Sequence, residues 1–136
     1  MTEDRVTGSL LDLMQNPEDI VPEFPNWPES WKYQDEDVPY GEALLEVMRS
    51  FVQSMIEQGL ARKTIRRHMG YLWLLGGEII RDMHIHEQYH DFVAEDALRD
   101  AVGSDSGPLC RHIHGNEDQR AFDTTCRKLH TFLHKS

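Results

Sequence analysis

Proline is distributed unevenly along this chain of 136 residues, and its distribution limits where long helices can form. Five of the six prolines lie between positions 17 and 39: Pro17, Pro22, Pro25, Pro28 and Pro39. Proline fixes φ and lacks a backbone N–H, so it interrupts the hydrogen-bond ladder of a helix interior. We therefore expect an extended N-terminal arm over residues 1–38 and a helical domain over residues 39–136.

The charge of the chain changes at the same boundary. The formal net charge is −10, and residues 1–38 account for −8 of it, with ten acidic and two basic side chains. The remaining residues carry only −2 and are close to neutral. A disordered acidic tail rarely carries two tryptophans, and this arm contains Trp27 and Trp31. We expect the arm to pack on its own body or on a second copy of the chain.

After Pro39, apolar residues recur at three- and four-residue steps, the period of an amphipathic helix. Four helices are predicted, over residues 39–59, 62–83, 92–103 and 116–133. Gly59 is expected to end the first helix in a left-handed conformation, and Asn116 to cap the last. Gly76 and Gly77, inside the second helix, predict a kink or a close crossing. No strand pattern competes, so the predicted fold is all-α, a small four-helix bundle with an extended arm.

No segment resembles a membrane span or an export signal. No apolar run approaches the ~18 residues that a span requires, and the N-terminus is acidic where a signal peptide is basic. The sequence therefore predicts a cytoplasmic protein with no membrane partner. In that compartment both cysteines, Cys110 and Cys126, are expected to remain reduced.

Two groups of histidines resemble metal sites. His86, Glu87 and His90 form the H-E-x-x-H pattern of zinc peptidases, but no third ligand follows at a known spacing. A second possible zinc site combines cysteine and histidine ligands: Cys110, His112, His114, Cys126 and His130. The spacing of these residues matches no known zinc finger. The two His-Ile-His runs could alternatively form short extended segments. We predict no metal, no cofactor and no enzymatic activity.

A cluster of positive charge opens the second predicted helix. Arg62, Lys63, Arg66 and Arg67 fall in its first two turns, where the helix dipole is already positive. This arrangement is unfavourable unless an anion, such as a phosphate group or the acidic arm, lies nearby. Alternatively, these side chains pair with Glu57 or are simply solvated.

The segment Gly59-Leu60-Ala61-Arg62-Lys63-Thr64-Ile65-Arg66-Arg67, following an amphipathic helix, resembles the core-binding (SAM-like) domain of tyrosine recombinases and phage integrases. The resemblance covers residues 42–83 best. It implies a SAM-like fold that clamps DNA, with Lys63, Thr64 and Arg67 near the backbone. No catalytic domain and no tyrosine nucleophile with Arg and His partners are recognised, so recombinase activity is not implied.

Two hypotheses follow from these observations. In the first, the chain is a non-catalytic DNA-binding or recombination-accessory module of a mobile element, which contacts duplex DNA through Arg62, Lys63, Thr64, Arg66 and Arg67. In the second, it is a protein-interaction module whose tryptophan-bearing arm reaches a partner or forms a homodimer.

Overall fold

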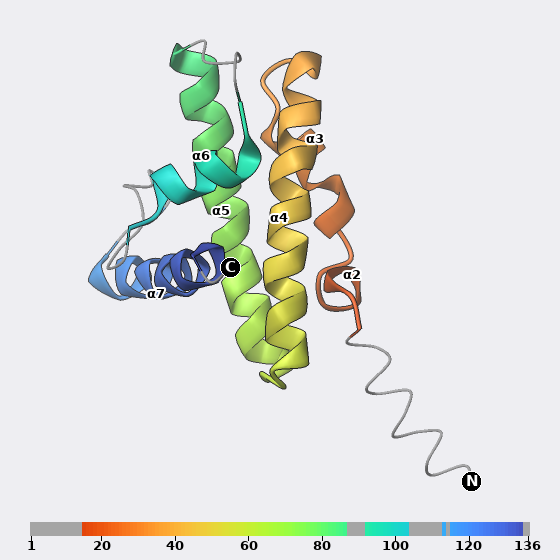
Figure 1. Ribbon diagram of the computed structural model, residues 1–136, viewed down its shortest axis with the longest axis vertical. Helices are drawn as coiled ribbons and strands as arrows, with labels where there is room; N and C mark the ends of the chain where they lie inside the picture. Colours follow the sequence, from red (N-terminus) through yellow and green to blue (C-terminus); the bar gives the residue numbers. More distant parts are fainter. Residues whose placement is uncertain (1–14, 87–91, 104–112, 114, 135–136) are drawn as a thin grey trace, which may run out of the picture.

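The computed structural model describes residues 15–86, 92–103, 113 and 115–134, and all its regular elements are helical. Four helices follow the arm, as the sequence predicts: α4 (Val38–Glu57), α5 (Arg62–His86), α6 (Ala94–Ala101) and α7 (Asn116–Leu133). In Figure 1, α4 and α5 run side by side along the long axis, and α7 crosses α5. Within the described ranges, no helix is long and apolar enough to cross a membrane.

The turn between α4 and α5 depends on a left-handed glycine. Gly59 has a φ of 80°, and its N–H donates to the Ile56 carbonyl at 3.0 Å. The N–H of Leu60 donates to the Met55 carbonyl at 3.2 Å, which completes a Schellman motif. The predicted C-cap is confirmed, and the chain reverses direction before α5 starts at Arg62.

The N-terminal arm contains four short helices between Pro17 and Asp37, so the prediction of an extended arm is wrong there. It forms α2 (Pro17–Ile20), η1 (Phe24–Asn26), α3 (Trp27–Trp31) and η2 (Asp35–Asp37). Three prolines of the arm, and Pro39 at the start of α4, lie at the first or second positions of helices; the three are Pro17, Pro25 and Pro28. At those positions the missing N–H would have no partner inside the helix, so proline starts a helix there instead of breaking it.

The arm contributes to the same hydrophobic core as the four longer helices. Ile20, Phe24, Trp27 and Trp31 are buried in one cluster with apolar side chains of α4 to α7. Trp27 and Trp31 are only 6% and 5% exposed. Packing of the arm on its own body is therefore confirmed for the described residues.

The predicted inner faces of α5 and α7 are also confirmed. The buried residues of α5 include Ile65, Met69, Leu72, Gly76, Ile79 and Met83, and those of α7 include Phe122, Cys126, Leu129 and Leu133. Two details differ. The N-cap of α7 is Gly115, with a φ of 87° that favours glycine, and Asn116 is the first helical residue. His84–His86 continue α5, so this His-Ile-His run is not extended.

Candidate functional site

The predicted nucleic-acid-binding residues lie together at the start of α5. The side chains of Arg62, Lys63, Arg66 and Arg67 are exposed, and Thr64 is half-buried beside them. Ile65, which is fully buried, anchors this turn to the core. We call Arg62, Lys63, Arg66 and Arg67 the basic patch.

The basic patch has no counterion among the residues that the structure describes. None of its four side chains forms an ion pair with a described carboxylate, Glu57 included. In contrast, Arg49 pairs with Glu18 at 2.7 Å, and Arg99 pairs with Glu95 at 2.7 Å. The expectation that the patch pairs with Glu57 or with the acidic arm is therefore not met within these residues.

Most acidic side chains of the described arm are engaged elsewhere. Lys32 pairs with both Glu29 and Asp35 at 2.9 Å, and its hydrogen bond to Asp35 lowers the pKa of that carboxyl. The hydrogen bond from Arg49 lowers the pKa of Glu18 in the same way. Asp37 is buried, and its Oδ2 accepts from the backbone N–H groups of Tyr33 and Gln34 at 2.8 and 3.1 Å. Much of the arm's negative charge is neutralised locally or used to cap short turns.

Helix α7 brings a further cation, Lys128, near His68 of α5. His68 on α5 is only 6% exposed, and its Nδ1 lies 2.6 Å from the hydroxyl of Thr125 on α7. Burial lowers the pKa of His68, and the positive charges of Lys128 and Arg67 lower it further. Lys128 and Arg67 therefore both lie near this imidazole. The position of Lys128 could not be predicted from the sequence, because only the contact between α5 and α7 brings Lys128 near His68.

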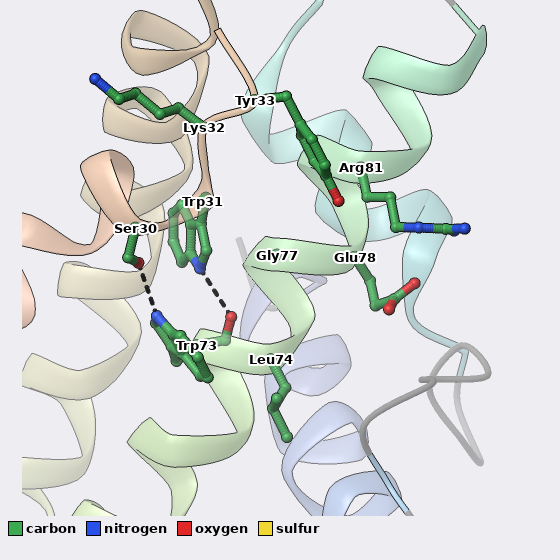
Figure 2. A pocket seen from close by; sticks show the side chains of 9 residues that line it. All are labelled: Ser30, Trp31, Lys32, Tyr33, Trp73, Leu74, Gly77, Glu78 and Arg81. Atoms are coloured by element: carbon green, nitrogen blue, oxygen red, sulfur yellow. Dashed lines mark hydrogen bonds between the residues drawn. The ribbon is translucent and has the colours of Figure 1, made fainter. Parts of the chain in front are cut away.

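A cleft lies between the arm and the middle of α5 (Figure 2). Its volume is about 240 Å³, and its lining residues come from two segments: Ser30, Trp31, Lys32 and Tyr33 of the arm, and Trp73, Leu74, Gly77, Glu78 and Arg81 of α5. Two aromatic side chains at this cleft remain accessible, Tyr33 at 54% and Trp73 at 41%. Tyr33 stacks on His84 with ring centroids 4.9 Å apart.

Two tryptophans fix the geometry of this cleft. The indole N–H of Trp31 donates to the backbone carbonyl of Trp73 at 2.9 Å, and the indole N–H of Trp73 donates to the Ser30 hydroxyl at 2.9 Å. Figure 2 shows these two hydrogen bonds crossing between α3 and α5. The ring of Trp31 lies against Gly76, where a Cβ atom would meet its Cζ2 at 2.2 Å. The glycine pair thus permits a close crossing, as the sequence suggested, and the crossing element is the arm.

The predicted metal motifs fall largely outside the described residues. Glu87, His90, Cys110, His112 and His114 are in this group, and the described residues contain no cluster of three or more ligand-type side chains. His130, on α7, stacks on His134 with ring centroids 4.2 Å apart, and Cys126 is buried in the core.

Comparison with known proteins gives no family assignment. A scan of protein-family models, a search of curated proteins and a search of solved structures each found no match to this chain.

Proposed function

We propose that this protein is a non-catalytic nucleic-acid-binding module that contacts the phosphate backbone through the basic patch. The observation that carries the proposal is four exposed cations, without counterions among the described residues, on the first two turns of one helix. Like charges at such spacing repel one another, so the free protein gains no stability from this arrangement. A polyanion would relieve the repulsion.

Duplex DNA is the proposed partner, with a recombination-accessory role in a mobile element. The support for duplex DNA is the resemblance of residues 59–67 to the DNA-clamping turn of integrase core-binding domains. By that resemblance Lys63, Thr64 and Arg67 approach the backbone, while Arg62 and Arg66 extend the positive surface. The acidic remainder of the chain opposes binding, so we expect measurable affinity only at low ionic strength.

A protein-interaction module is the second candidate function. The buried packing of Trp27 and Trp31 accounts for the arm's tryptophans without a partner. The accessible rings of Tyr33 and Trp73 favour this candidate, because aromatic side chains are enriched at binding surfaces.

The test is a titration of the full chain against fluorescently labelled duplex DNA at several low salt concentrations. If each cation of the basic patch neutralises one phosphate, log K should fall against log salt with a slope of about −3.6, or roughly −0.9 per contact. The double substitution Arg66→Glu with Arg67→Glu should remove most of the affinity and most of the slope.

A charge-matched control is available on the last helix. Arg120 and Arg127 are exposed and lie seven residues apart, on the side of α7 opposite its buried face. Arg120→Glu with Arg127→Glu changes the net charge equally but should change the affinity much less. Lys128 is excluded from this control because it lies near His68, the residue that follows Arg67. Loss of affinity as large as that of the α5 variant would mean that only net charge matters, and no DNA binding by the folded chain would favour the interaction module.

A further inference from the structure

We infer that the cleft between the arm and α5 accepts an unpaired base, so that the nucleic acid bound best is a single strand stacked on Trp73. The inference rests on the proposed function and adds a second form of nucleic acid to the duplex proposed there: the phosphates of both forms contact the basic patch, and only the single strand also stacks on Trp73. Its starting point is the continuity between the cleft and the basic patch, which occupy the same exposed side of α5.

Helix geometry places the two features in line. Arg66, Gly70, Trp73, Gly77 and Arg81 follow one another at steps of three or four residues, so they share one face of α5. Arg66 to Trp73 covers two turns, about 10 Å, and Arg66 to Arg81 covers about 22 Å. A stacked strand carries one phosphate per ~3.4 Å, so about three nucleotides could lie between Arg66 and Trp73. Beyond Trp73 the arm covers this face, with the ring of Trp31 against Gly77.

Gly70 has no structural role that explains it. It lies in the helix interior between Arg66 and Trp73, is exposed, and has no atom within 4 Å of the position that a Cβ would occupy. Glycine there lowers helix stability relative to alanine. In contrast to Gly76, which is packed against Trp31, Gly70 leaves open space on the surface between Arg66 and Trp73. A phosphate backbone running from the basic patch to the cleft would use that space.

Trp73 has the properties of a stacking platform. Its indole N–H is bound to Ser30, so the orientation of the ring is fixed and its accessible surface is apolar. Base–aromatic stacking on such a ring needs no particular base, and it is a common source of affinity for single strands. A duplex keeps its bases stacked on one another and cannot use the platform without unpairing.

Two charged side chains line the end of the cleft away from Trp73 and could contact a neighbouring nucleotide. Glu78 and Arg81 are half-buried, and neither has an ion-pair or hydrogen-bond partner among the described residues, although they are three residues apart on one helix. The side chains point away from the arm in Figure 2. A carboxylate accepts from the amino and imino groups of a base, and a guanidinium donates to its carbonyl oxygens. At about 240 Å³ the cleft is smaller than pockets for drug-sized ligands, which suits a single ring system.

The experiment compares a labelled single strand of about 12 nucleotides, a length within the usual range for single-strand sites, with a duplex of equal length. The full chain should bind the single strand more tightly at the same salt. Trp73→Leu should weaken single-strand binding about tenfold, leave duplex binding nearly unchanged, and retain its helical circular dichroism. Trp73→Phe should keep most of the single-strand affinity because a stacking ring remains.

Tryptophan emission provides a second measurement that does not depend on the Leu variant folding. A base stacked on Trp73 should quench the emission of the wild type, and the quenching should disappear in Trp73→Phe while binding persists. If Trp73→Leu folds and binds the single strand normally, or if saturation causes no quenching, this inference is wrong even though Arg66→Glu with Arg67→Glu may still abolish binding. If neither strand form binds, the proposed function fails as well, and an aromatic-rich peptide becomes the favoured occupant of the cleft.

Discussion

Two glycines of α5, Gly70 and Gly76, differ in how much space surrounds them. Gly76 is buried against the indole of Trp31, with no room for a methyl group, while Gly70 faces open space. Substituting each by alanine therefore separates packing from intrinsic helix propensity.

Gly76→Ala is expected to destabilise the fold by about 1–3 kcal/mol, because the new methyl group must displace a buried ring held by a hydrogen bond. Gly70→Ala is the matched control and should stabilise the fold by about 0.5–1 kcal/mol. Urea denaturation of the two variants measures both changes. Equal effects would show that the contact between Trp31 and Gly76 does not form in solution.

His68 predicts a dependence of stability on pH. Burial, together with Lys128 and Arg67, lowers the pKa of the folded imidazole below 6.5, so the unfolded chain takes up a proton first. Stability contributed by neutral His68 is therefore complete above pH 6.5 and is lost as the pH falls from there toward the folded pKa.

The comparison is between the wild type and His68→Gln, whose amide can still bond to Thr125 without being protonated. Urea midpoints at pH 7.5 and 5.5 should fall further for the wild type than for the variant. The other histidines are common to both proteins and cancel in this comparison. Parallel decreases in the two proteins would mean that His68 is protonated as easily in the folded state as in the unfolded one.

At the scale of elements, the arm unfolds with the helices that it covers. Phe24, Trp27 and Trp31 are buried in the common core, so the arm has no separate core of its own. In a Trp73→Phe variant, the two remaining tryptophans should show blue-shifted emission, and their urea transition should coincide with the loss of helical circular dichroism. Solvent-like emission, or a fluorescence change at lower urea, would indicate an arm that detaches independently.

The longer helices could be predicted from sequence because their apolar period is a local property. The interiors of α4, α5 and α7 follow the three- and four-residue steps, and Gly59 ends α4 as its left-handed conformation requires. The short arm helices could not be predicted in this way, since the effect of a proline depends on where a helix starts. In α2 and α3 the prolines occupy the first or second helical position, which the spacing of prolines alone does not reveal.

Only part of the candidate site could be predicted from the sequence. The basic patch is a run of neighbouring residues, so its charge is apparent without a structure. Lys128 and the cleft with Tyr33 and Trp73 depend on contacts between segments far apart in the chain, which no local pattern reports. The outward position of Trp73 follows from the same helical period that buries Leu72, and its accessible ring could have been recognised from that period.

For the whole molecule, the arm cannot be removed without damaging the fold. A chain lacking residues 1–38 loses Ile20, Phe24, Trp27 and Trp31 from the core, so it should show reduced helical circular dichroism and no cooperative transition. A chain lacking only residues 1–14 keeps every described contact of the arm and serves as the control. A cooperative transition in the shorter protein would show that residues 39–136 fold alone.

The hydrogen bond from the Trp31 indole to the Trp73 carbonyl joins residues 42 positions apart. During synthesis the arm therefore leaves the ribosome before the segment of α5 that it contacts. Ribosomes add about 5–20 residues per second, so the arm is synthesised some 2–8 seconds before the segment of α5 on which it docks. During that interval two tryptophans and a phenylalanine lack their place in the core. The newborn chain therefore exposes the apolar side chains of Phe24, Trp27 and Trp31 for several seconds, although in the finished protein these three are buried in the core.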